Sequence, residues 1–159
     1  MIDLHVHTTA SDGQYTPTEI VKKASDHNIK IMAITDHDTI NGLDEAKNAG
    51  EKFGVKIIPG IELNINGSPG EFHLLGLGLK EISQSMTNVL NDVIINRNKR
   101  NEEMILKINA AGVDITYDEL ISRFPNTIIG RPHFAQILQE KKIVKTRQQA
   151  FDLYLATGR

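Results

Sequence analysis

Short apolar segments alternate with amphipathic segments over the first 80 residues, and this order constrains the fold more than any other feature. The apolar segments predict strands, and the segments between them have the spacing of helices. Strands are expected at 2–7, 30–35, 55–65 and 72–79, with helices starting at Pro17 and at Asn41. An order of strand, helix, strand, helix, strand is typical of an α/β fold with a parallel sheet or barrel.

Both helices of this region carry boundary signals. Pro17 stands at a first helical position, Thr16 precedes it as a candidate N-cap, and Glu19 completes a capping box. Asn41 is the expected N-cap of the second helix. Gly54 is expected to end that helix, because glycine readily adopts the left-handed conformation that closes a helix.

The second half has a different character. Apolar residues recur at helical spacing from 83 to 111, and shorter helical patterns follow at 117–124, 131–141 and 147–156. No repeat or linker separates the halves. We therefore expect an α/β region at 1–80 and a helical insertion at 81–159 that packs on it.

Composition restricts the kind of site and partner. The 159 residues are 40% hydrophobic, which fits one globular fold, and the net charge of -2 gives no global attraction to nucleic acid. The chain has no cysteine, so a metal site would have to use His, Asp and Glu. No apolar run approaches the roughly 18 to 20 residues that a membrane span needs. A soluble, cytoplasmic protein that does not engage membranes is expected.

Two histidines one residue apart end the first apolar segment. Side chains at i and i+2 of a strand share a face, so His5 and His7 should project together while Ile2, Leu4 and Val6 pack the other way. Two adjacent imidazoles suit a metal ion. For this pair alone, two partly buried and hydrogen-bonded histidines are the more ordinary interpretation.

Further potential ligands occur where the other predicted strands end. The full set, in chain order, is His5, His7, Asp12, His37, Glu62 and His73. Parallel strands place their carboxyl ends at one rim, where active sites of such folds are built, so these residues should converge. His73 fits less simply because it opens its strand; either that strand starts near residue 70 or it runs with a different geometry. The recurrence favours a metal site.

The residues that carry these ligands resemble a known family. His-Val-His-Thr-Thr-Ala-Ser-Asp-Gly, Ile-Thr-Asp-His-Asp, Pro-Gly-Ile-Glu and His-Leu-Leu-Gly resemble, in order and spacing, the first motifs of the polymerase and histidinol phosphatase (PHP) domain family. The second half is similar to one branch, the phosphoesterases related to 5'-3' exoribonucleases and nucleoside 3',5'-bisphosphate phosphatases. Arg97, Arg100 and the segment Gly-Arg-Pro-His-Phe-Ala at 130–135 carry that similarity.

The resemblance implies the N-terminal part of a distorted, TIM-like (β/α)7 barrel, about four strands, with up to three ions of manganese, iron or zinc. By motif, His5 and His7 would bind one ion and Glu62 would bridge it to a second. His73 would bind the second ion, and Asp12 with His37 would bind the third. Closely spaced ions can clamp both oxygens of a displacement at phosphorus, so no protein nucleophile is required.

The family pattern continues with a later His and a terminal Asp-x-His that this sequence does not match. We therefore expect an N-terminal portion of a longer protein that is incomplete and poorly active by itself. A partial barrel has open strand edges and exposed apolar residues. Self-association or a covering chain is expected at that edge.

Four residues of the second half are candidates for substrate binding. Arg131 and His133 could reach a phosphate, since guanidinium pairs with phosphate oxygens and Pro132 leaves backbone donors free at a helix start. The alternative is an ordinary exposed helix start. Arg97 and Arg100 are further candidates, although arginines in a polar helix middle are more often simply solvated.

Two aspartates flank the ligand His37, and one of them, Asp36 or Asp38, could orient an imidazole from behind. The leading functional hypothesis is a metal-dependent phosphoesterase, a hydrolase acting on a 5'-phosphorylated nucleotide or short RNA. A small-molecule phosphatase of the histidinol phosphatase type is the second hypothesis. A non-catalytic PHP module that binds metal or a partner is the third.

Overall fold

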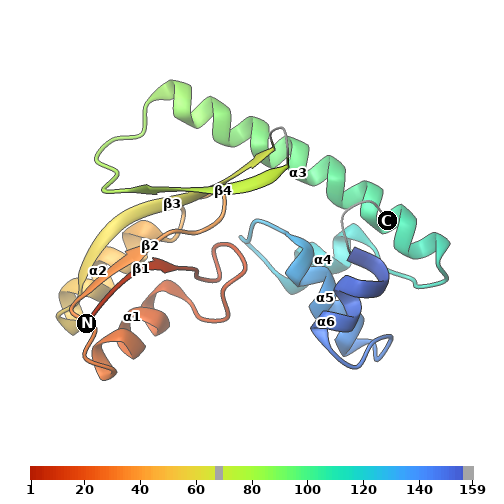
Figure 1. Cartoon of the computed structure of the whole chain (residues 1–159), viewed down its shortest axis with the longest axis horizontal. Helices are drawn as coiled ribbons and strands as arrows, with labels where there is room; N and C mark the ends of the chain where they lie inside the picture. The colour runs from red at the N-terminus through yellow and green to blue at the C-terminus, as the bar shows by residue number, and fades with distance from the viewer. Residues whose placement is uncertain (67–69, 156–159) are drawn as a thin grey trace. The chain divides into compact units, whose positions relative to one another are not determined.

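The computed structural model describes residues 1–66 and 70–155 of the chain. It divides into two compact units, Met1–Asp92 (unit 1) and Val93–Arg159 (unit 2). Unit 1 contains, in order, β1 (Ile2–Val6), α1 (Pro17–Asp26), β2 (Ile31–Ile34), α2 (Leu43–Phe53), β3 (Lys56–Asn66) and β4 (Glu71–Leu77) (Figure 1). This is the predicted α/β order, with four strands among the described residues.

Helix α3 (Gln84–Ala110) continues from unit 1 into unit 2. Unit 2 adds α4 (Tyr117–Arg123), α5 (Arg131–Glu140), α6 (Arg147–Ala150) and a π-helical turn, η1 (Phe151–Leu155). The sequence predicts the change from the α/β region to the helical region near residue 80, whereas the two units divide within α3. Packing of the helical region on the strands stays a prediction.

The sheet has the order β1-β2-β3-β4. β1, β2 and β3 are parallel, as predicted, but β4 is antiparallel to β3. Both alternatives considered for the last strand are confirmed, because β4 starts at Glu71 and runs in the opposite direction to β3. The finding also explains the position of His73, because the start of an antiparallel β4 lies beside the end of β3, where Asn64 pairs with His73.

The core of unit 1 joins the two helices to the sheet. Its fully buried members include Val21 of α1, Ile34 of β2 and Ala46 of α2. Of the three apolar residues of β1, only Val6 packs against this core, whereas Ile2 and Leu4 are exposed. The predicted common packing of all three was wrong because the register shifts within β1, an edge strand, between Asp3 and Val6.

The helix signals were mostly correct. The Thr16 hydroxyl accepts a hydrogen bond from the Glu19 backbone, and the Glu19 carboxylate accepts one from the Thr16 backbone, which is the predicted capping box. Gly54 ends α2 with φ of 70°. Asn41 is not the N-cap of α2; Gly42 is. A Cβ on Gly42 would lie 3.1 Å from Thr8 Oγ1, so the close approach of the strand-end loop favours glycine there.

Unit 2 has a core of its own, built by the second half of α3, the loop after it and α4 to η1. Its buried residues are Ile105, Ile108, Val113, Ile115, Leu120, Ile129, Phe134, Ala135, Ile137, Leu138, Val144, Ala150 and Leu155. The three shorter helical patterns of the sequence are confirmed as α4, α5 and α6 followed by η1. The last residue of the third pattern, 156, lies outside the described residues.

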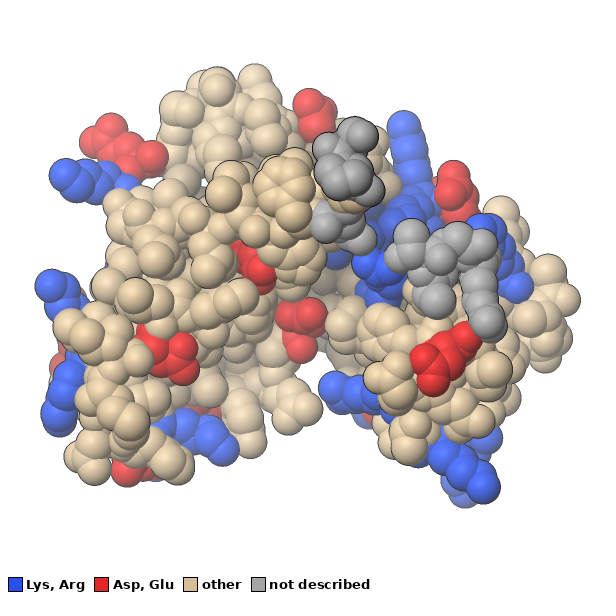
Figure 2. Space-filling model, in the orientation of Figure 1, with Lys and Arg blue, Asp and Glu red and all other residues tan. Residues whose placement is uncertain are grey.

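Acidic and basic side chains are interspersed over the face of the molecule drawn in Figure 2, in keeping with a net charge of -2. Within residues 1–66 and 70–155, no helix combines the length and the apolar character needed to cross a bilayer.

Candidate metal centre

All six predicted ligands come together in unit 1. They form three overlapping groups in which one donor atom from each residue lies within 4.8 Å of the others. The groups are His5, His7 and Glu62; His7, Asp12 and His37; and His37, Glu62 and His73. Each group shares a member with the next, so the arrangement is one cluster rather than three separate sites.

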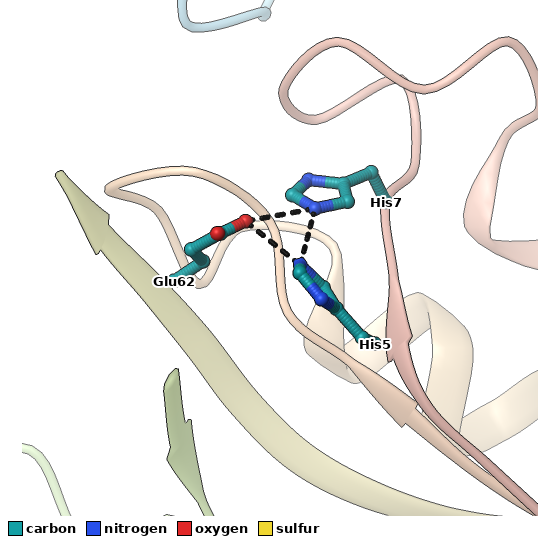
Figure 3. A group of neighbouring side chains, drawn as sticks. All are labelled: His5, His7 and Glu62. Carbon is teal, nitrogen blue, oxygen red and sulfur yellow. Dashed lines mark hydrogen bonds and ion pairs between the residues drawn. The ribbon is translucent and has the colours of Figure 1, made fainter. Parts of the chain in front are cut away.

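Glu62 of β3 is the centre of the cluster. Its Oε2 lies 3.0 Å from Nε2 of His5, 2.9 Å from Nε2 of His7 and 3.5 Å from Nδ1 of His37. Its Oε1 lies 2.8 Å from Nδ1 of His73. Figure 3 shows His5 and His7 pointing toward the Glu62 carboxylate from the end of β1. The two carboxylate oxygens therefore face different sets of imidazoles.

The Glu62 side chain is 3% exposed, whereas those of His5 and His73 are 48% and 46% exposed. Burial alone would raise the pKa of the Glu62 carboxyl, because it disfavours the charged form. Hydrogen bonds with His5 and His73 and the charge of His37 outweigh burial and hold the pKa of Glu62 below its ordinary value of 4.5. An ionised carboxylate thus lies beneath half-exposed imidazoles at neutral pH.

Asp12 supplies the second carboxylate of the cluster. Its Oδ1 lies 3.5 Å from Nδ1 of His7, and its Oδ2 lies 3.8 Å from Nε2 of His37. The rings of His7 and His37 are 4.6 Å apart between centroids. Four imidazoles and two carboxylates make a nitrogen and oxygen donor set that suits zinc, manganese or iron. The residues present therefore fit the expected ions of manganese, iron or zinc.

The backbone explains why these side chains meet. β2 ends at Ile34, and the segment after it continues alongside β3, where His37 forms a parallel bridge with Glu62. The Asp38 backbone donates to the Glu62 carbonyl, and the Asp38 carboxylate accepts from the Asn64 backbone. Asp38 has φ of 55°, a left-handed conformation that aspartate tolerates better than most residues. Asp38 therefore fixes β3 beside the ligand His37.

Asp36 binds the loop after β1. Its carboxylate accepts hydrogen bonds from the Thr8 backbone at 2.7 Å, the Thr8 hydroxyl at 2.8 Å and the Ser11 hydroxyl at 2.6 Å. Ser11 Oγ in turn lies 3.4 Å from Nδ1 of His7. Sequence reasoning missed Thr8 and Ser11. The only signal for them was a polar turn directly after the His-x-His strand.

The candidate substrate residues lie in unit 2. Arg97 and Arg100 are half-buried on α3, and Arg131 is half-buried at the start of α5. A Cβ on Gly130, the residue before Arg131, would lie 3.3 Å from Nη1 of Arg97. Arg97 therefore lies against the start of α5. On the face drawn in Figure 2, Lys and Arg side chains gather near α3.

Arg100 and His133 are tied to the same segment. Arg100 Nη2 donates to Oδ1 of Asn101 at 3.4 Å, and Asn101 Nδ2 donates to the Ile129 carbonyl at 3.1 Å. Nδ1 of the buried His133 accepts a hydrogen bond from the Gly130 backbone at 2.9 Å. Arg97 and His133 therefore lie against the turn that leads into α5, and Arg131 follows that turn. Arg100 is connected to the turn through Asn101.

Fold and site together define an α/β protein with a candidate multinuclear metal centre of histidines and carboxylates at its strand ends. The model of the PHP domain matches residues 3–155. The chain belongs to the PHP domain family.

Its relatives include phosphoesterases. A 5'-3' exoribonuclease from Haemophilus influenzae is 36% identical over 157 residues, covering 99% of this chain and 57% of that protein. A 3',5'-nucleoside bisphosphate phosphatase from Chromobacterium violaceum is 32% identical over 159 residues, covering 99% of this chain and 56% of that protein. The chain thus spans little more than half the length of these curated relatives.

A solved structure from Bifidobacterium adolescentis, a candidate metal-dependent phosphoesterase, superposes with a TM-score of 0.92 at 28% identity. The alignment covers 99% of this chain and 56% of that one. The fold predicted from the resemblance is confirmed by this likeness over nearly the whole chain.

Proposed function

We propose that the protein supplies the metal centre of a phosphoesterase that hydrolyses 5'-phosphorylated nucleotides or short RNA. The observation that carries the proposal is the cluster around Glu62, in which one buried, ionised carboxylate faces imidazoles through both of its oxygens. The names of the relatives support the phosphate ester as substrate. A cytoplasmic location is part of the same proposal.

In this proposal His5, His7 and Glu62 would hold one ion, and Glu62 and His73 would hold a second. Asp12 and His37 would hold a third. The two Glu62 oxygens lie near different imidazoles, which supports a shared role for Glu62 in holding two ions. Manganese, iron and zinc all accept imidazole and carboxylate ligands.

Divalent ions in such a site lower the pKa of water and polarise the phosphate. The chain's own residues supply the charge balance and the orientation. The buried Glu62 carboxylate offsets part of the positive charge. The half-exposed His5 and His73 leave the cluster open on the side where a phosphate would approach.

We further propose that Arg97, Arg100 and Arg131 bind the substrate phosphate, with His133 holding the turn that presents Arg131. Guanidinium groups bind phosphate oxygens through paired hydrogen bonds. The support is that Arg97 and His133 lie against the turn that precedes Arg131, and that Arg100 is connected to this turn through Asn101. A phosphate group there would meet several cations at once.

The exposed apolar residues of the sheet suggest a covering surface. Leu75 pairs with Glu62 across the hairpin and shares its face, and Leu77 lies two residues further along. Both are exposed, as is Leu4 of β1. We propose that another chain or self-association covers them.

The metal proposal is tested by elemental analysis after loading with manganese or zinc and removal of free ions. The wild-type chain should retain metal, and a His5→Ala, His7→Ala double variant should lose it. His27→Ala is the matched control, because the His27 ring binds the Lys23 carbonyl at the end of α1, outside the cluster. A wild-type chain that retains no metal after loading contradicts the proposal.

The activity is tested with a 5'-phosphorylated dinucleotide, a nucleoside 3',5'-bisphosphate and histidinol phosphate. We expect very slow hydrolysis by this chain alone, with preference for the nucleotides. Preference for histidinol phosphate would support the small-molecule phosphatase instead. Fast turnover at low metal concentration would contradict the expectation that further family ligands are needed.

A further inference from the structure

The Asp36 carboxylate is buried next to the ligand cluster. Asp36 is 1% exposed, and its two partners Thr8 and Ser11 are 0% and 1% exposed. A buried carboxylate is costly unless hydrogen bonds replace its water, and here three short bonds do so. Asp36 is therefore held in one position by groups that all belong to the loop after β1.

That loop carries a metal ligand. The Thr8 carbonyl accepts hydrogen bonds from the Ser11 and Gly13 backbones, and the Thr8 hydroxyl accepts one from the Ala10 backbone. The loop is thus closed on Thr8, and Thr8 is fixed by Asp36. Asp12 lies within this closed loop, which places its carboxylate beside His7 and His37.

The Ser11 hydroxyl connects Asp36 to the His7 ring. A hydroxyl has one proton, and Ser11 donates it to Asp36 at 2.6 Å. Toward Nδ1 of His7, at 3.4 Å, Ser11 can therefore only accept. Asp12 Oδ1, the other group near Nδ1, is also an acceptor. Both neighbours favour a proton on Nδ1. Nε2 lies 2.9 Å from another acceptor, Glu62 Oε2, so with an ion in the proton's place between these two groups the lone pair would be on Nε2.

The His7 Nε2 atom faces the centre of the cluster, 2.9 Å from Glu62 Oε2 and 3.1 Å from Nε2 of His5. We propose that Asp36 is a positioning residue that acts through Ser11: it fixes the loop that carries Asp12 and selects the His7 tautomer whose Nε2 binds metal. The inference rests on the proposed metal centre. Metal-binding histidines depend on such hydrogen bonds to the other ring nitrogen.

Zinc affinity tests the inference, measured by competition with a chromophoric chelator. Ser11→Ala should weaken binding by about 10- to 100-fold, the usual effect of losing a group that orients a metal ligand. Ser25→Ala is the matched control, because Ser25 also donates its hydroxyl proton within unit 1, to the Phe53 carbonyl at 2.8 Å. The control should bind zinc as the wild type does. Thermal unfolding establishes that both variants are folded.

Long-range ¹H–¹⁵N NMR of the zinc-loaded wild type gives a direct signature. We expect the His7 ring to carry its proton on Nδ1 and zinc on Nε2. Zinc on Nδ1, unchanged affinity of Ser11→Ala, or equal losses in both serine variants would overturn the inference while leaving the metal centre intact. A wild-type chain that binds no zinc would instead overturn the proposed metal centre, and the inference with it.

Discussion

Replacement of Glu62 by glutamine isolates the charge at the centre of the cluster. Glutamine keeps the shape of the side chain but removes the negative charge that four imidazoles approach. Glu62 belongs to two of the three ligand groups. In Glu62→Gln, only the group of His7, Asp12 and His37 therefore keeps all of its ligands. Loss of an outer partner of a ligand lowers metal affinity about 10- to 100-fold, so loss of a shared anionic ligand should cost at least about 100-fold.

The expected loss of zinc affinity can be converted into a change in the free energy of unfolding. At a free zinc concentration of about 100 times the wild-type Kd, binding stabilises the folded chain by about 2.7 kcal/mol. For a variant that binds about 100-fold more weakly, the same concentration gives about 0.4 kcal/mol. With about 4 to 8 °C per kcal/mol for a unit of this size, zinc should raise the wild-type Tm by roughly 10 to 20 °C and the variant's by about 2 to 3 °C.

The assay is thermal unfolding followed by circular dichroism, with and without zinc. Glu45→Gln is the matched control, because Glu45 also lies in unit 1 and accepts hydrogen bonds from Thr18, outside the cluster. Zinc should raise the Tm of the control as much as that of the wild type. An equal rise for Glu62→Gln would falsify the assignment of Glu62 as the shared ligand.

Three other predictions concern pH, the loop and the phosphate site. Because the pKa of Glu62 is depressed in the folded state, its contribution is present above the ordinary value of 4.5 and is lost as pH falls below it. In acid unfolding of the metal-free chain, the free energy of unfolding should therefore fall more steeply with decreasing pH for the wild type than for Glu62→Gln. Gly13→Ala should destabilise the chain by roughly 1 to 3 kcal/mol in urea unfolding and weaken zinc binding, since its Cβ would lie 2.4 Å from the His7 carbonyl oxygen; Gly70→Ala, in open space, should do neither. Arg97→Ala should weaken binding of a labelled 5'-phosphorylated dinucleotide by about 10- to 100-fold in fluorescence anisotropy, whereas Arg123→Ala should not.

Local sequence signals predicted what depends on neighbours along the chain. The capping box of Thr16 and Glu19 and the left-handed Gly54 are determined within one turn of helix, and both were correct. His5 and His7 were found from their two-residue spacing at the end of the first apolar segment, although β1 ends at Val6 and its register shifts between Asp3 and Val6. Such features need no knowledge of tertiary contacts.

Features that depend on distant contacts could not be predicted in the same way. Gly42, rather than the expected Asn41, is the cap of α2, and the buried side chains of Thr8 and Asp36 leave little room for a side chain there. Those contacts span 34 and six positions of the chain and leave no periodic signal. The antiparallel direction of β4 is another such feature, and the odd position of His73 was its only trace in the sequence.

The position of the ligands relative to the core decides how well function can be separated from folding. None of the six ligands belongs to the buried apolar cluster of unit 1, which lies between β2 and the helices α1 and α2. Removal of a ligand therefore creates no cavity in that core, and the large losses of stability that follow core truncation are not expected. Asp36 differs from the ligands because its buried carboxylate closes the β1 loop. Substitutions at Ser11 are consequently the sharper probe, since they leave the two bonds between Asp36 and Thr8 in place.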